Sequence, residues 1–193
     1  METRQRILRC AEALFQEKGY NGVSMRDIAE AAGIKVGNLT YYFPKKERLV
    51  EALFNGGSGQ AYRPEALSSP EDFIAYFRHL LKVQRRHAFY FDSYVQLSQS
   101  SALLRRTQLE LLEALRRLFL DGLGRLAEQG QAAPERYAGE LEDRTEALLQ
   151  LLMLRLPGQE RRETAEAADE ALLRRLALVM GCGSFSFSEK SEK

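Results

Sequence analysis

The sequence predicts an all-α protein in which an N-terminal three-helix domain of the helix-turn-helix type is joined to a C-terminal helical bundle. Leu, Ala, Glu and Arg, which are good helix formers, dominate the 193 residues, and strand-like alternation of polar and apolar residues is scarce. A glycine-rich stretch at residues 55–59 interrupts the helical pattern. We therefore expect one domain over residues 1–54, a second over residues 60–183, and a flexible tail at 184–193.

The first helix is expected over Arg4–Lys18, because its apolar residues recur at helical spacing and Gly19 can end it. The second is expected to begin at Ser24. A serine there can cap the free amides of the first turn, and the acidic Asp27 complements the helix dipole. Gly33 is placed to end this helix after about two and a half turns.

A short third helix is expected over Val36–Phe43 and ends at Pro44, which cannot continue it. Leu39 and Phe43 stand four residues apart and can anchor one face inward. A fourth helix follows over about Lys45–Phe54. These short helices, joined by tight turns, make up the predicted N-terminal domain.

The C-terminal domain is expected to consist of longer helices. Ser69 and Pro70 make a good helix start, and the pattern then continues towards Leu97 with a possible break near residues 86–88. Gly130 is placed to end the first of the next three helical segments, and Pro157 and Gly158 the second. These segments are Leu103–Glu128, Tyr137–Leu156 and Thr164–Met180.

Composition excludes several classes of protein. Hydrophobic residues make up 45% and charged residues 28%, which is typical of a globular chain, and no apolar run reaches the ~20 residues that a membrane helix needs. No signal-peptide pattern is present at the start, so we expect a cytoplasmic protein without a membrane partner. Cys10 and Cys182 lie far apart and show no metal-ligand spacing.

The net charge of the chain does not indicate whether it binds nucleic acid. The net charge is +1, and residues 1–54 contain nine basic and seven acidic side chains. Global attraction to DNA is therefore weak, and any such function must depend on where particular cations stand.

The third helix has an unusual composition for a helix that is buried in a hydrophobic core. Residues 35–43 combine a cation, an amide, a hydroxyl and two phenols. Gly37 costs a helix about 1 kcal/mol relative to Ala, and close approach of a ligand to the backbone is one reason to keep it. Lys45 and Lys46 oppose the dipole at the start of the next helix, and a nearby phosphate would offset that cost.

Residues 24–49, SMRDIAEAAGIKVGNLTYYFPKKERL, closely resemble the DNA-binding region of the tetracycline-repressor (TetR) family. The resemblance extends over about residues 4–54, and the C-terminal part fits the family only in architecture. It implies a sequence-specific transcriptional regulator, by family default a repressor, that binds double-stranded DNA as a homodimer on a palindromic operator and is released by a small-molecule effector.

The resemblance also implies roles for individual residues. Those at the start of the second helix match phosphate or base contacts, those at the turn and start of the third match base-reading positions, and the remainder match backbone contacts. The implied set is Ser24, Arg26, Lys35, Val36, Gly37, Asn38, Thr40, Tyr41, Tyr42 and Lys46. The chain departs from the family pattern in having Lys where a capping Ser or Thr is common, Thr where an aromatic is common, and Val in place of a frequent polar residue. Without the flanking pattern, the aromatic residues at 41–43 could equally be core.

In the C-terminal domain the resemblance implies an effector pocket and a dimer interface built from the last two helices. An aromatic concentration supplies pocket candidates, and two strongly apolar helices supply interface candidates. The pocket set is Phe73, Phe77, His87, Tyr90, Phe91 and Tyr94, and the interface set is Leu148, Leu152, Leu172, Leu176 and Val179. Packing within a single chain is the alternative for both sets.

The sequence also bears on two other classes of function. A helical enzyme would need a nucleophile with a base, or a metal cluster. His79 and His87 have no such partners in the sequence, so no catalytic, metal or cofactor site is expected. A helical adaptor without DNA binding is the other alternative, and salt-sensitive binding to DNA would distinguish the two.

Overall fold

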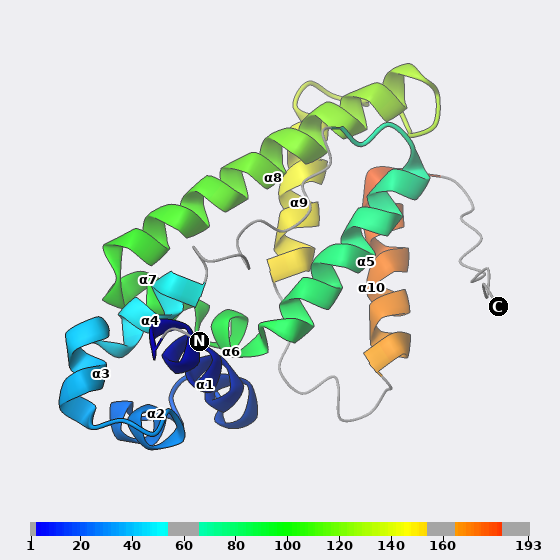
Figure 1. The fold of residues 1–193 in the computed structure, drawn as a ribbon. Coiled ribbons are helices and arrows are strands. Elements are labelled where there is room, and N and C mark those ends of the chain that lie inside the picture. Colours follow the sequence, from blue (N-terminus) through cyan, green and yellow to red (C-terminus); the bar gives the residue numbers. More distant parts are fainter. Residues whose placement is uncertain (1–2, 54–65, 154–164, 183–193) are drawn as a thin grey trace. The chain divides into compact units, whose positions relative to one another are not determined.

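The computed structural model describes residues 3–53, 66–153 and 165–182, and it contains helices and no strand in these ranges (Figure 1). The predicted all-α class is therefore confirmed for the described part of the chain. The helices are α1 (Thr3–Lys18), α2 (Met25–Ala31), α3 (Val36–Tyr42), α4 (Lys46–Leu53), α5 (Pro70–Arg86), α6 (Ala88–Asp92), α7 (Tyr94–Ser100), α8 (Ala102–Glu128), α9 (Glu140–Met153) and α10 (Ala165–Met180).

The helix boundaries agree with the sequence predictions to within a few residues, with two differences. The predicted break near residue 87 is present, but the chain breaks again at Ser93, whose backbone leaves the helical region at φ −107° and ψ 15°. The helix predicted from Tyr137 begins instead at Glu140, because Gly139 adopts φ +92° and cannot be part of an α-helix. Predicted helix beyond residue 153 and the predicted tail lie outside the described residues.

The chain divides into two compact units. The first comprises Met1–Arg63 with Val83–Glu110, and the second Pro64–Lys82 with Leu111–Lys193. Helices α5 and α8 contribute to both units. The functional boundary expected after residue 54 remains a prediction, since the first compact unit also takes in residues 83–110.

The first unit is built around α1. This helix packs against α2, α4 and α6, and α2 packs against α3. At the centre the Phe15 ring lies 5.6 Å from that of Tyr20 and 5.3 Å from that of Phe89, between ring centroids. Full burial of such aromatic side chains is worth about 2–3 kcal/mol each, so this cluster holds the short helices that cannot be stable alone.

The second unit has its own apolar core. Phe73, Phe77 and Phe119 are fully buried with ring centroids 5.4–6.1 Å apart, and α9 packs along α10. Gly122 lets α8 approach Phe73, since a Cβ there would come 2.6 Å from the ring. At the start of α9, Glu140 accepts hydrogen bonds from Arg136 and Arg144. In the described residues no helix is both long and apolar enough to span a membrane.

Candidate nucleic-acid interface

The entry to α2 is fixed by reciprocal hydrogen bonds between Ser24 and Asp27. The Asp27 amide donates to Ser24 Oγ at 3.2 Å, and the Asp27 carboxylate accepts from the Ser24 amide and hydroxyl, both at 2.7 Å. These bonds lower the pKa of Asp27, the bond from the Ser24 backbone most of all. The predicted capping role of Ser24 is confirmed. Its hydroxyl hydrogen is directed to Asp27, so a phosphate contact would have to come from the opposite side or displace that bond.

The turn between α2 and α3 is a tight helix stop. Gly33 adopts φ +64°, its amide donates to the Glu30 carbonyl at 2.9 Å, and the Ile34 amide donates to the Ala29 carbonyl at 3.0 Å. This pair of bonds satisfies the last carbonyls of α2 and reverses the chain in a defined way. The turn therefore fixes the direction in which α3 leaves α2, as a helix-turn-helix requires.

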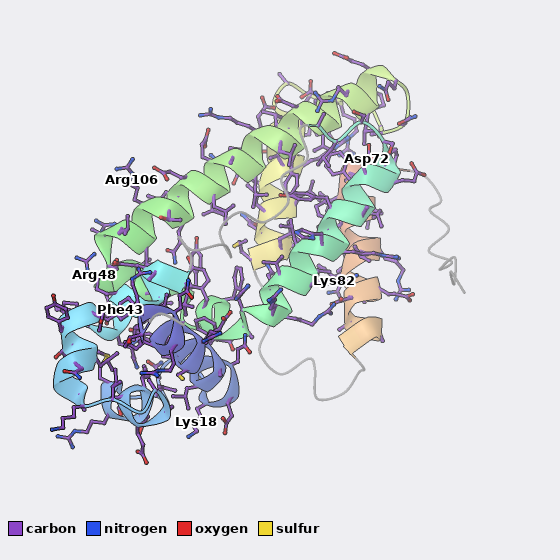
Figure 2. All side chains as sticks on the ribbon, viewed as in Figure 1. Lys18, Phe43, Arg48, Asp72, Lys82 and Arg106 are labelled. Atoms are coloured by element: carbon purple, nitrogen blue, oxygen red, sulfur yellow. The ribbon has the colours of Figure 1, made fainter. Side chains whose placement is uncertain are left out.

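Helix α3 has one face inside and the rest outside. Leu39 is fully buried and Phe43 is 2% exposed, so the predicted inward anchors are confirmed. Figure 2 labels Phe43 at the end of α3. Lys35 precedes the helix in extended backbone and makes no side-chain cap, as expected for a lysine.

Gly37 is not required by packing within the chain. A Cβ built at this position meets nothing within 4 Å, and its φ is not positive. Alanine would therefore fit and would favour the helix. Close approach of an outside partner at this glycine remains a prediction.

Two tyrosines extend outward from the last turn of α3. Tyr41 is 83% exposed and Tyr42 is 42% exposed, with their rings edge-to-face at 5.5 Å. Single exposed aromatics are common, but these are two adjacent phenols on a seven-residue helix, and both can form hydrogen bonds with a partner outside the chain. The alternative that these tyrosines are core residues does not hold, whereas it does hold for Phe43.

Lys46 has a structural role that the sequence did not reveal. Its ammonium donates to the carbonyls of Tyr20 and Val23 at 2.7 and 2.8 Å and lies 4.0 Å from the centre of the Tyr20 ring. Partial burial lowers its pKa, and Glu47 partly offsets that effect. Burial together with Glu47, which accepts the Tyr20 hydroxyl at 3.0 Å, raises the pKa of Tyr20. Two of the three ammonium protons are used within the chain, which leaves one for a phosphate.

The predicted DNA-contacting set lies together on α2, α3 and the first turn of α4. Every member is exposed except Lys46, which is half-buried. The Thr40 hydroxyl donates back to the Gly37 carbonyl at 3.0 Å, so its oxygen remains available as an acceptor.

The predicted pocket set is divided between the cores of the two units. Phe73 and Phe77 belong to the core of the second unit, whereas Tyr90, Phe91 and Tyr94 pack on the core of the first. His87, whose pKa is lowered chiefly by burial, lies edge-on to Phe89 in the first unit. The effector site therefore remains a prediction.

The predicted interface set is divided by burial. Leu148, Leu152 and Leu176 are at most 1% exposed within the single chain, so they are covered by its own core. Leu172 and Val179 stay partly exposed, and Leu178 on the same helix is 80% exposed. Residues of α10 that point outward are therefore better interface candidates than the buried leucines.

Among the described residues, no group of three or more His, Cys, Asp or Glu side chains could hold a metal ion. Sequence reasoning also missed Arg4, which lies beside α3, and a hydrogen bond between Glu51 and Ser101. Neither could be found from local patterns, because the partners are separated by 39 and 50 positions in the sequence.

Curated relatives match the N-terminal part of the chain. The repressor KstR2 of Mycobacterium tuberculosis is 42% identical over 53 residues, 28% of this chain, and the regulator UidR of Escherichia coli K12 is 39% identical over 51 residues, 26% of this chain. Each match spans only 26% of the relative's own length. This sequence similarity therefore covers the helix-turn-helix region.

Solved structures share the fold over nearly the whole chain. A TetR-family regulator from Marinobacter aquaeolei VT8 has a TM-score of 0.79 at 17% identity, covering 93% of this chain and 90% of the other. KstR2 of M. tuberculosis has a TM-score of 0.63 at 21% identity, covering 93% and 94%. The sequence model of bacterial regulatory proteins of the tetR family matches residues 7–53. The N-terminal region of the chain is therefore similar to the tetR family of bacterial regulatory proteins, and the chain shares its fold with solved TetR-family regulators.

Proposed function

We propose that this chain is a sequence-specific DNA-binding transcriptional regulator, a repressor that binds a palindromic operator as a homodimer and leaves it when a small molecule binds. The observation that carries the proposal is the outward face of α3. It presents an open glycine, an amide and two exposed phenols, while Leu39 and Phe43 fix the helix from behind. Such a face fits the major groove, where base edges are read by hydrogen bonds and methyl contacts.

The groups on this face divide into two kinds of contact. Val36 is 39% exposed at the first position of α3 and can meet a thymine methyl, and Asn38 can pair with an adenine edge. Tyr41 and Tyr42 at the far end suit phosphate oxygens. The N-terminal residues of α3 would then recognise the base sequence, and its C-terminal residues would fix the position of the protein along the DNA.

The dimer follows from the size of α3. A helix of seven residues reads only a few base pairs, so specificity needs two copies on half-sites about 34–36 Å apart or a multiple of that. The outward residues of α10, above all Leu178, support an apolar contact between two copies.

The effector is proposed from a protein that shares the fold and from the aromatic residues of this chain. KstR2, which shares the fold, is described as a ketosteroid transcriptional regulator. An apolar effector would suit the aromatic composition of this chain, and it releases DNA only if it binds the DNA-free state more tightly. A thermal-shift screen of apolar small molecules tests this part separately from DNA binding.

The direct test is fluorescence anisotropy of a labelled mixed-sequence duplex titrated with the full chain at rising salt. We expect binding at low salt that weakens linearly on a log–log plot as salt rises, since bound phosphates release counterions. An Asn38→Ala variant should retain this non-specific binding but lose preference for a selected site. Absence of salt-sensitive binding by a folded chain would reject the regulator function and favour the adaptor.

A further inference from the structure

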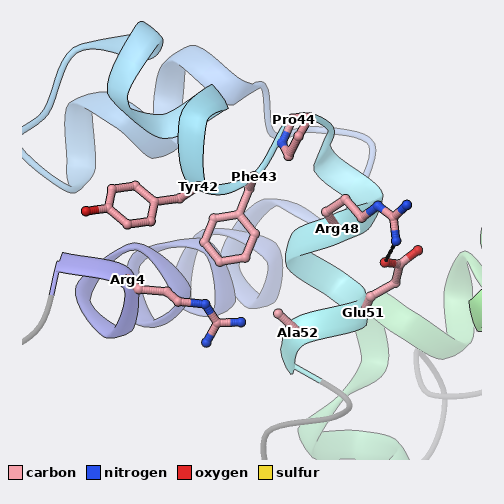
Figure 3. Close-up of a pocket in the computed structure, with 7 residues that line it drawn as sticks. All are labelled: Arg4, Tyr42, Phe43, Pro44, Arg48, Glu51 and Ala52. Carbon is pink, nitrogen blue, oxygen red and sulfur yellow. Dashed lines mark hydrogen bonds and ion pairs between the residues drawn. The ribbon is translucent and has the colours of Figure 1, made fainter.

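A cleft opens beside the end of α3, within the first unit. It has a volume of about 420 Å³ and is lined by Arg4 from α1, residues 42–44, and Arg48, Glu51 and Ala52 from α4. In Figure 3, Arg4 extends alongside the Phe43 ring, and Arg48 and Glu51 lie on α4. The cleft therefore joins the first turn of α1 to the helix that carries the proposed base contacts.

Arg4 is held in place by the ring beneath it. Its guanidinium carbon lies 5.4 Å from the centre of the Phe43 ring, a cation–π contact. Phe43 is almost fully buried and caps the end of α3, so the arginine is oriented by the end of α3. An arginine fixed in this way loses less side-chain entropy when it binds a partner than a free one does.

The charges of the cleft leave one cation uncompensated. Arg48 donates to the Glu51 carboxylate at 2.7 Å, and these two charges cancel. Within the described residues no carboxylate pairs with Arg4. The lining therefore carries a net charge of +1, which matches the single negative charge of a phosphodiester.

We propose that this cleft seats a backbone phosphate of the bound DNA and that Arg4 is its principal donor. The inference rests on the proposed DNA-binding function and extends the contact surface beyond α2, α3 and Lys46 to α1. In Figure 3 the Tyr42 hydroxyl points away from the Arg4 guanidinium, so the two groups suit different phosphates. Arg4 and Tyr42 would then hold the strand on either side of Phe43.

The test compares two substitutions that remove the same charge. Arg4→Ala removes the cation from the cleft, and Arg6→Ala removes an exposed cation from the same helix, two residues and thus about 200° away. Affinity for a labelled duplex is measured over a range of salt for both variants and the parent. Arg4→Ala should remove one phosphate contact from each protomer of the homodimer, and so lower the salt slope by about 1.8 and weaken binding several-fold. Arg6→Ala should keep the parental slope.

A third variant separates phosphate binding from support of α3. Arg4→Lys keeps the charge but loses the planar contact with Phe43, so it should restore the salt slope while thermal stability falls as in Arg4→Ala. A purely structural role predicts that Arg4→Lys and Arg4→Ala lose affinity alike with unchanged slopes. That result, or equal slopes for Arg4→Ala and Arg6→Ala, overturns the inference.

The phosphate group that the cleft is proposed to bind could also come from inorganic phosphate in solution. If the cleft accepts inorganic phosphate as a ligand in its own right, phosphate should compete with DNA more strongly than chloride at equal ionic strength for the parent, and not for Arg4→Ala. We expect no such difference, because a single phosphate lacks the neighbouring contacts that position a strand. If the parent chain does not bind DNA at all, the proposed function itself is rejected. If the parent binds DNA and Arg4→Ala binds it equally well, only the inference about Arg4 is rejected.

Discussion

Ser101 donates a 2.6 Å hydrogen bond to the buried carboxylate of Glu51, which stands fifty residues earlier in the chain. The same hydroxyl oxygen accepts from the Leu104 amide at 3.2 Å and so caps the start of α8. Because Glu51 lies on α4 and also pairs with Arg48, one serine connects α4 to the first turn of α8. Both ends of this link lie within the first unit.

Replacing Ser101 by Ala should lower the free energy of unfolding by about 2 kcal/mol. The change removes a helix cap and takes one donor from a buried carboxylate, and each loss costs on the order of 1 kcal/mol. Urea unfolding measures the effect. Ser100→Ala is the matched control, since Ser100 is exposed and donates only to the Leu97 carbonyl. Equal stability of the two variants would contradict this account of Ser101.

Lys46→Ala should destabilise the fold, whereas Lys45→Ala should not. Lys46 satisfies two carbonyls and covers the Tyr20 ring, so its loss should cost about 2 kcal/mol, while exposed Lys45 lies just before α4. Thermal or urea unfolding of both variants checks this. If both changes leave the free energy of unfolding unaltered, the hydrogen bonds from Lys46 to the carbonyls of Tyr20 and Val23 do not stabilise the fold.

Gly37→Ala should separate folding from DNA binding. Alanine meets nothing at this position and favours a helix, so stability should rise by up to about 1 kcal/mol, yet DNA affinity should fall at least tenfold because a methyl group intrudes on the contact. Gly124→Ala in α8 is the control, because its added Cβ also meets nothing within 4 Å. Parental DNA affinity in Gly37→Ala would argue against close approach at this residue.

Stability should fall in acid through Glu140. Hydrogen bonds, first from the Arg136 side chain, lower its pKa to about 2 from an ordinary value of 4.5. A depressed folded pKa contributes stability that is complete above pH 4.5 and is lost as pH falls towards 2. The stability difference between the parent and Glu140→Gln should therefore shrink over that interval in urea titrations. Glu142→Gln, an exposed neighbour on the same helix, should show no such trend.

Most helices of the fold could be predicted because the residues that start, line and end a helix lie close together in the sequence. Periodic apolar residues, the Ser24 cap and Gly33 were sufficient to place α1, α2 and α3, and the inward anchors Leu39 and Phe43 followed from their spacing. The breaks at Ser93 and Gly139 were missed, since neither serine nor glycine dictates a break when it stands alone.

The site was predictable only where its residues are close in sequence. The exposed face of α3 follows from a nine-residue stretch, whereas the carbonyl partners of Lys46 and the ring beneath Arg4 depend on how α1, α3 and α4 pack. The aromatic pocket set fell into two separate cores because nearness in sequence does not determine which core a side chain joins.

Selection of bound duplexes from a random DNA pool by the full chain tests the central claim most directly. We expect enrichment of a palindromic motif whose half-site centres are separated by about one helical turn, roughly 10 base pairs, or a multiple of it. The Asn38→Ala variant should fail to enrich the same motif. A pool that stays as random as the input, with a chain that is folded and dimeric, would contradict the account.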